Sequence, residues 1–264
     1  MTTALKRNRN TEHRRPLAAA VLALAALAWV GLAWPDLLAH HGGAATPDPM
    51  AHMGHLPVGP AVGPVLLAWV VMVVAMMLPP ALPLLTTVAG LAVGRGCPML
   101  LAALAGATFV AVWTVAGAAL LGLDTALRQV LVLAADPGTA AAVVLVAAGL
   151  YQLSPLAQRC LTACRSPRST ALRYWTGRRP AWAETVGLSA SYGLTCVGCC
   201  WALMVISLTV AVAALPVMVV LAVVMAAQRL LPHGRRLVRP TGFLVLALGI
   251  AALAGFLPAG VLVA

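Results

Sequence analysis

The chain has 264 residues, of which 62% are hydrophobic and only 9% are charged, and its mean hydropathy is +0.98. Soluble domains are about one-quarter charged, so this composition excludes an ordinary soluble domain. The net charge of +11 would point to nucleic acid in a soluble protein, but we find no nucleic-acid motif, and the positions of the basic residues explain the charge differently.

Apolar residues fall in blocks of roughly 18 to 30 residues, and a helix needs roughly 20 residues to cross the hydrocarbon of a bilayer. Open strands leave backbone groups unsatisfied in lipid, so the blocks are predicted to be helices. The sequence therefore predicts an all-α polytopic transmembrane bundle of about seven spans, forming a single domain over residues 17–264. The predicted spans are residues 17–34, 63–93, 97–121, 139–153, 183–211, 215–230 and 243–263.

Residues 1–16 are predicted to be a basic cytoplasmic tail. A basic stretch followed by an apolar run is also the pattern of a secretory signal. The run is long for a signal core, and no convincing small-residue cleavage site precedes Asp36. The first span is therefore expected to be retained as a membrane anchor.

Residues 35–60 are rich in Gly, Pro and Ala and are predicted to be a flexible outer loop. Histidine and methionine alternate there, and imidazole with thioether suits copper in an oxidising compartment. The alternative is a plain solvated loop. The candidate metal ligands of this loop are His40, His41, His52, Met53 and His55.

The second apolar block is too long for one straight crossing, and its sequence "MLPPALP" predicts a kinked or broken helix. Met72, Met76 and Met77 precede the prolines, with Met72 and Met76 one helical turn apart. Thioethers bind Cu(I) well and hard cations poorly. These methionines are candidate ligands, with ordinary packing as the alternative.

Residues 157–181 are predicted to be a basic cytoplasmic loop, with a helix or turn lying at the lipid headgroups. Cys160 and Cys164 lie in this loop, four residues apart. On a helix they would share one face. They could pass metal to or from the cytoplasm, or they could be incidental thiols.

The fifth block contains the sequence "TCVGCCW". Cys196, Cys199 and Cys200 share one face if this block is a helix. Soft thiolates favour Cu(I), zinc or iron–sulfur centres. The alternative without a metal is that these cysteines pack as small hydrophobic residues. At about 1.5 Å per residue, these thiols and the methionines of the second block lie at similar depths and could meet in a bundle.

With the amino terminus in the cytoplasm, 16 of the 17 basic residues lie on the inner side, and only Arg128 lies outside. This asymmetry predicts the orientation in a bacterial inner membrane, with anionic lipid as the contact of the basic segments. The acidic residues all lie in tails, loops or at a helix end. The absence of a carboxylate in mid-span counts against proton-coupled transport.

The chain resembles a bacterial family described as uncharacterised predicted metal-binding integral membrane proteins, a domain-of-unknown-function family. The resemblance extends over residues 69–232 and rests on "AMMLPPALPLL", "GLYQLSPLAQRCLTACRSP" and "YGLTCVGCCWALM". It implies a multi-span metal-binding protein. The matching positions are Met76, Met77, Tyr151, Gln152, Cys160, Cys164, Cys196, Cys199, Cys200 and Met204.

Together these patterns predict a membrane protein that handles copper, by binding it, transporting it or metallating a partner. Cu(I) is the expected ion, with zinc as the alternative, and a metalloprotein or membrane subunit is the expected partner. A thiol oxidoreductase using Cys196 and Cys199, with Cys160 and Cys164 as a second pair, and an assembly subunit of a membrane enzyme stay open. A hydrolase is not expected, because the sequence has no Ser/His/Asp or HExxH constellation.

Overall fold

The computed structural model describes residues 2–42, 62–130, 137–209 and 214–256, and within them the side chains of residues 14–34, 63–123, 138–207 and 215–256. Throughout these residues the regular structure is helical. The helices are α1 (Thr2–Gly42), α2 (Val62–Met77), η2 (Pro79–Ala81), α3 (Leu82–Leu91), α4 (Pro98–Val130), α5 (Pro137–Leu153), α6 (Pro155–Cys164), α7 (Pro167–Tyr174), α8 (Ala181–Thr209), α9 (Ala214–Leu230), η3 (Gly234–Leu237) and α10 (Val238–Leu253).

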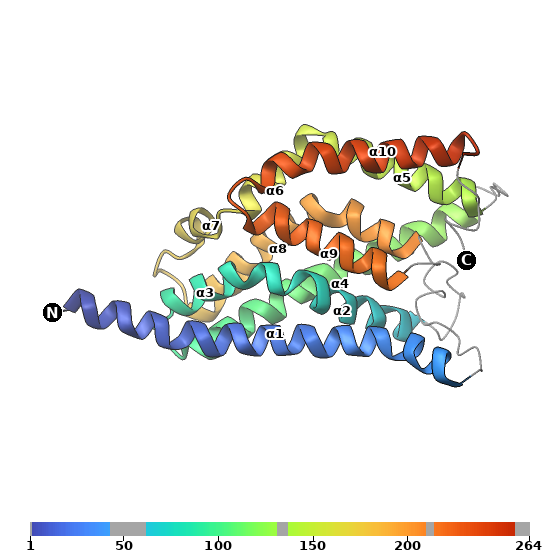
Figure 1. Cartoon of the computed structure of the whole chain (residues 1–264). Coiled ribbons are helices and arrows are strands. Elements are labelled where there is room, and N and C mark those ends of the chain that lie inside the picture. Colours follow the sequence, from blue (N-terminus) through green and yellow to red (C-terminus); the bar gives the residue numbers. More distant parts are fainter. Residues whose placement is uncertain (1, 43–61, 131–136, 210–213, 257–264) are drawn as a thin grey trace.

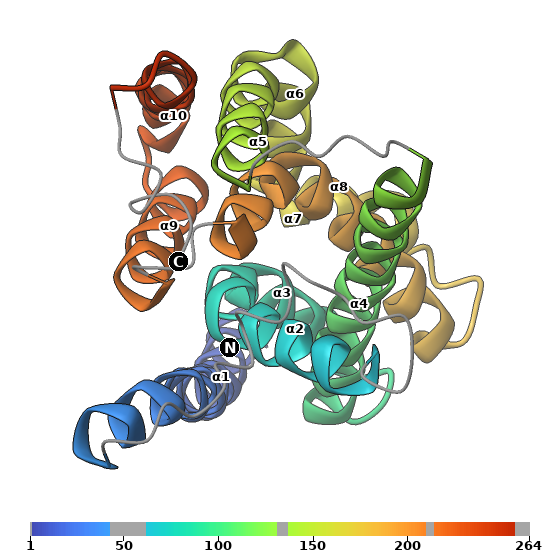
Figure 2. The same cartoon turned by 90° about the vertical axis from the view of Figure 1, so that its right-hand side faces the viewer.

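The long helices lie side by side along one common direction and form an elongated bundle (Figure 1). Helix α8 packs on α4, α5, α6 and α9, while α2 packs on α1 and α4, and α10 packs on α5. Seen from one end, α8 lies inside the bundle, whereas α1 and α10 lie at its margin (Figure 2). The fold therefore surrounds the cysteine-bearing helix with other helices.

Four helical segments are long and apolar enough to cross a membrane, and two bent helix pairs raise the number to six. Helix α9 offers a shorter apolar stretch, Leu215–Leu230. At about 1.5 Å per residue it covers less than the roughly 30 Å of a hydrocarbon core. The all-α architecture is thus confirmed for the described residues. The structure gives four to six candidate spans, whereas the sequence predicted about seven.

Both bent pairs have a proline at the break. Helices α2 and α3 meet at 56° across the three-residue helix η2, which confirms the predicted break at the prolines. Helices α5 and α6 meet at 65°, where Ser154 caps α6 by accepting a hydrogen bond from the Ala157 amide and Pro155 opens the helix. This second bend was not predicted, and it turns α6 onto α8.

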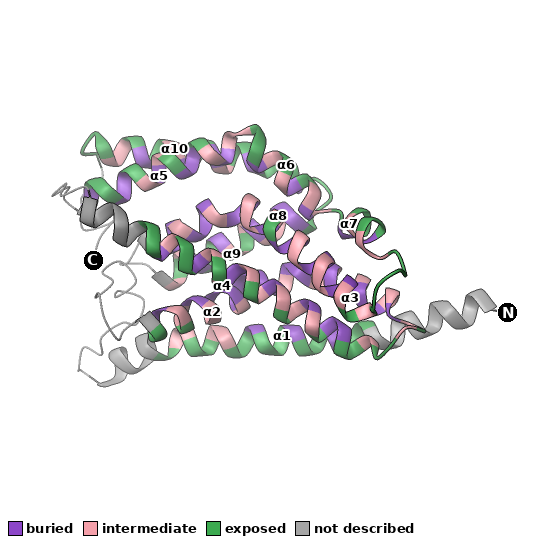
Figure 3. Ribbon diagram, turned by 180° about the vertical axis from the view of Figure 1, so that it is seen from behind, coloured by how far each residue is buried: buried purple, intermediate pink, exposed green. Residues whose placement is uncertain are grey.

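The outer faces of the marginal helices are apolar. Figure 3 shows many exposed positions along α1 and α10, whereas buried positions are frequent on α2 and α8. The exposed side chains include large hydrophobic residues of α1 and α10, namely Leu22, Leu24, Leu27, Val30, Phe243, Leu244, Leu248 and Ile250. An apolar exterior of this kind is what a bundle in lipid requires.

The arginine-bearing connections gather at one end of the bundle. The link between α3 and α4, the segment around α7, and the link between α9 and α10 all lie at the end where α1 begins (Figure 1). At that end Arg95 forms an ion pair with Glu184 at 2.7 Å. The bundle therefore has one strongly basic end.

Candidate metal centre

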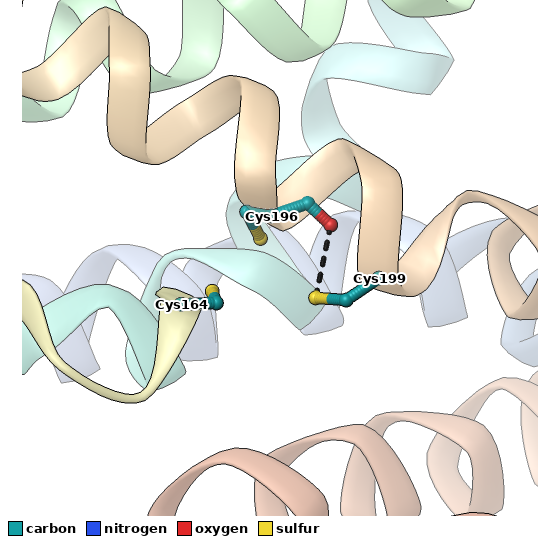
Figure 4. Close-up of side chains that lie close together, drawn as sticks. All are labelled: Cys164, Cys196 and Cys199. Carbon is teal, nitrogen blue, oxygen red and sulfur yellow. Dashed lines mark hydrogen bonds between the residues drawn. The ribbon is translucent and has the colours of Figure 1, made fainter. Parts of the chain in front are cut away.

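Three buried thiols from two helices meet inside the bundle. The Sγ atoms of Cys164, Cys196 and Cys199 all lie within 4.8 Å of one another. Their side chains are 1%, 0% and 3% exposed. Figure 4 shows Cys164 at the end of α6, facing Cys196 and Cys199 on α8. We call this group the thiol triad.

The spacing of the triad matches that of ligands to one ion. Thiolate sulfur lies about 2.3 Å from an ion such as zinc, so two sulfurs on opposite sides of one ion are about 4.6 Å apart. Three thiols within 4.8 Å can therefore close on a single ion with little backbone movement. The donor set consists of soft ligands, which suit Cu(I), zinc and iron–sulfur centres.

Helix α8 supplies two of the three thiols because cysteines three residues apart lie on one helical face. The Cys199 thiol donates a hydrogen bond to the Cys196 carbonyl oxygen at 3.2 Å, drawn as a dashed line in Figure 4. The Cys200 thiol is also buried and lies 3.3 Å from Cys199 Sγ. A fourth thiol thus adjoins the triad.

Helix α6 supplies the third thiol, and Arg165 holds the end of this helix in place. The Arg165 guanidinium donates hydrogen bonds to backbone carbonyls at the end of α9, including those of Leu231 at 2.6 Å and Pro232 at 3.1 Å, and to the Gln228 carbonyl. Carbonyls at a helix end lack intrahelical partners and attract cations. Because Arg165 follows Cys164 directly, this clamp fixes the position of the third thiol.

A buried arginine lies beside the triad. Arg229, near the end of α9, is 5% exposed and donates a hydrogen bond to the Tyr192 hydroxyl at 2.9 Å. Tyr192 precedes Cys196 by one turn of α8. The sequence placed Arg229 among the basic residues of the inner side, whereas in the structure its side chain is buried among the helices.

The Tyr151 hydroxyl, from α5, donates a hydrogen bond to the Gly198 carbonyl at 2.5 Å, within the sequence "TCVGCC". The Tyr151 ring also meets the Trp201 ring edge-on, with the centroids 4.9 Å apart. These contacts fix α5 against the cysteine-bearing turn of α8.

A family model described as PpoB2, copper chaperone, matches residues 66–252. The chain belongs to the PpoB2 copper chaperone family. All three thiols of the triad, with Cys200 and Arg229, lie inside the matched residues. No curated protein matched the chain, and no solved structure did. The family match bears out the metal-binding part of the resemblance seen in the motifs, whereas the uncharacterised family itself is not confirmed.

Membership of a copper chaperone family and the thiol triad together support metal binding, with copper as the metal. Four thiols lie at this site, namely the three of the triad and that of Cys200. Three of them, Cys196, Cys199 and Cys200, were predicted from the sequence as candidate metal ligands. Cys164 was not proposed as their partner, because it was assigned to a cytoplasmic loop. The signal that could have found it is "LSPL", in which a Ser cap and a Pro predict that a new helix starts.

The predicted methionine ligands are buried in the same hydrophobic core as the thiol triad. Met72, Met76 and Met77 lie on α2, which packs on α1 and α4, while the triad lies on α6 and α8. Their role as ligands stays a prediction.

The His and Met residues predicted to collect metal lie outside the described side chains and precede the residues that the family model matches. The backbone of α1 continues as helix through His40 and His41 to Gly42. His52, Met53 and His55 lie outside the described residues. Their metal-collecting role stays a prediction.

Proposed function

We propose that this chain is a copper chaperone of a bacterial inner membrane, which holds Cu(I) as cargo inside its helical bundle and passes it to a metalloprotein. The observation that carries the proposal is the thiol triad, in which three buried sulfur ligands converge from two helices. The family match supplies copper as the metal and a chaperone as the role.

The proposed membrane location rests on the length of the apolar helices and on the positions of the basic residues. We propose seven crossings, counting each bent pair and α9 as one, with the amino terminus in the cytoplasm. The four to six candidate spans and the apolar outer faces of α1 and α10 support integration in lipid. The basic end of the bundle supports the orientation, because positive residues remain on the cytoplasmic side.

Cu(I) is the favoured cargo over zinc because the matched family is described as a copper chaperone. The thiols of the triad, with Cys200 beside them, are soft ligands that suit Cu(I). Thioethers also bind soft Cu(I). The buried methionines of α2 therefore remain candidates for a second binding position in the same core.

The route of the cargo follows from the proposed orientation. Residues 35–60 would face the oxidising compartment, where His40, His41, His52, Met53 and His55 could collect copper through imidazole and thioether groups. The triad would receive it within the bundle. Delivery to a metalloprotein on either side of the membrane would complete the chaperone function.

Burial argues against the thiol oxidoreductase alternative. Thiol–disulfide exchange requires an accessible thiolate and a resolving partner, whereas the triad thiols are at most 3% exposed. Alkylation of the purified protein separates the two functions. A metal site gains reactive thiols when a Cu(I) chelator is added, and a redox pair gains them when a reductant is added.

The decisive experiment measures copper bound to the detergent-purified chain. Wild type, single Ser variants of Cys164, Cys196 and Cys199, and the triple variant are loaded with Cu(I) without oxygen and assayed by inductively coupled plasma mass spectrometry. We expect about one copper ion per wild-type chain and a loss in the triple variant. Cys97→Ser is the matched control, because Cys97 is an exposed thiol. Copper retained by the triple variant at the wild-type ratio would overturn the proposal.

A further inference from the structure

Arg229 is a buried charge with unused hydrogen-bonding capacity. Its side chain is 5% exposed, and its Nη2 group donates to the Tyr192 hydroxyl. Its Nε and Nη1 groups are buried without a hydrogen-bond partner in the part of the chain that the structure describes. Arginine stays protonated in proteins, so it carries its positive charge into the bundle.

Among the described side chains, no carboxylate compensates this charge. Among the residues with described side chains, the ion pair that the fold forms is between Arg95 and Glu184, and Arg229 has no acidic side chain within ion-pair distance. An isolated charge taken out of water is costly unless an opposite charge and hydrogen bonds offset it. Within the described residues, Arg229 is therefore a buried cation without an anionic partner.

The groups able to supply that anion are the thiols. Cys164, Cys196 and Cys200 lie near enough to the Arg229 guanidinium for their thiolate forms to attract it. The aromatic ring of Tyr192, one turn before Cys196, lies 5.8 Å from the guanidinium carbon. Arg229 thus faces the metal-binding side of α8 from α9.

The charges of a copper–thiolate complex fit this arrangement. When Cu(I) binds two thiols, each thiol releases one proton to solvent, and the complex carries one positive and two negative charges. Its net charge is one negative unit, which a single guanidinium neutralises. The third thiol of the triad can remain protonated and bind as a neutral, weaker ligand, and the whole centre is then neutral inside the apolar bundle.

We propose that Arg229 is the counter-charge of the copper centre, and that the cargo is therefore held as a singly negative Cu(I)–dithiolate complex. This inference rests on the proposed function, because it assumes that the triad binds copper. It assigns to Arg229 an electrostatic role in loading the site. Nε and Nη1 are the donors available to the bound thiolate sulfurs.

The test compares Cu(I) affinities by competition with a chromogenic Cu(I) chelator, using full-length protein in detergent. Arg229→Met removes the charge and retains much of the side-chain volume, and Arg229→Gln removes the charge but can still donate to Tyr192. We expect both to bind Cu(I) about tenfold or more weakly than wild type. Arg229→Lys retains the charge and should stay within a few-fold. Arg173→Met, at an exposed arginine of α7, should leave affinity unchanged.

Melting of the copper-free proteins separates a counter-charge from a structural role. Replacing an uncompensated buried charge with an apolar side chain is neutral or stabilising, so copper-free Arg229→Met should melt no lower than wild type while binding copper more weakly. Tyr192→Phe, which removes the hydrogen bond and retains the charge, should bind within a few-fold of wild type.

Wild-type affinity in both neutral variants would overturn the counter-charge role, and so would a loss of affinity matched by an equal loss of copper-free stability. Neither result would disturb the proposed function, provided that wild type binds copper and the triple Ser variant does not. Failure of wild type to bind copper through the triad would instead refute the proposed function itself. The two failures are therefore distinguishable in one set of proteins.

Discussion

Cys160 on α6 lies against the backbone of Gly198 on α8, so closely that a Cβ atom at position 198 would stand 2.8 Å from Cys160 Sγ. Non-bonded atoms attract each other best at about 3.5–4.0 Å. The glycine therefore sets how near α6 comes to α8. Since these two helices carry the thiol triad, a shift of α6 at this contact would also move Cys164 relative to its partners.

Replacing Gly198 with Ala should weaken copper binding. The added methyl group pushes α6 away and moves Cys164 from Cys196 and Cys199, so we expect roughly a tenfold loss in Cu(I) affinity, measured by chelator competition. Gly31→Ala on α1 is the matched control, because a Cβ there meets no atom within 4 Å. Equal affinities for the two variants would contradict the role of this contact.

Removing the Arg165 clamp should also weaken copper binding, because it releases the end of α6 that carries Cys164. Arg165→Ala frees carbonyls at the end of α9 and releases the residue next to Cys164, so we expect lower copper affinity and a loss of about 1–2 kcal/mol in stability. Arg168→Ala, three residues further on and exposed, is the control. An unchanged affinity in Arg165→Ala would show that α6 is held by its packing on α8 alone.

The ion pair between Arg95 and Glu184 should matter for stability and leave metal binding intact. Glu184 is buried and also accepts hydrogen bonds from the Thr176 hydroxyl at 3.1 Å and the Arg179 amide at 3.3 Å. We expect Glu184→Gln to cost about 1–3 kcal/mol, seen as a lower melting temperature, with copper per chain unchanged. Lost copper in a stably folded Glu184→Gln protein would link this end of the bundle to the metal centre.

Cys97 offers a direct check of the proposed orientation. It is an exposed thiol in the connection between α3 and α4, at the basic end of the bundle. A membrane-impermeant maleimide should label it in inverted inner-membrane vesicles and leave it unlabelled in intact spheroplasts. Cys97→Ser is the control that identifies the labelled site. Labelling in spheroplasts instead would reverse the orientation.

Most of the helices could be predicted from local sequence. The apolar run at 183–211 predicted α8, which spans Ala181–Thr209, and the prolines after Met77 predicted the break before α3. The bend before α6 was missed because the arginines after it resemble an ordinary inner loop. What turns α6 inward is its packing on α8. The buried residues Ala157, Leu161 and Cys164 do follow a helical spacing, but that spacing does not say which helix they pack on.

The candidate site could be predicted only where its parts share one helix. Cys196 and Cys199 are three residues apart, so helical geometry alone places them together. Cys164 joins them through the 65° bend between α5 and α6. Arg229 was missed for a related reason, because a basic residue at a helix end fits the inner-side charge pattern. Its burial follows from packing between α8 and α9.

The division of the triad between a continuous helix and a short one has a consequence for cargo release. Two ligands are rigidly related through α8, while the third sits on α6, which joins α5 at a break beside Ser154. A small change of angle at that break would withdraw one sulfur and leave the other two in place. We therefore expect copper to leave by exchange of one ligand at a time, with the incoming partner's donor taking the position that Cys164 vacates.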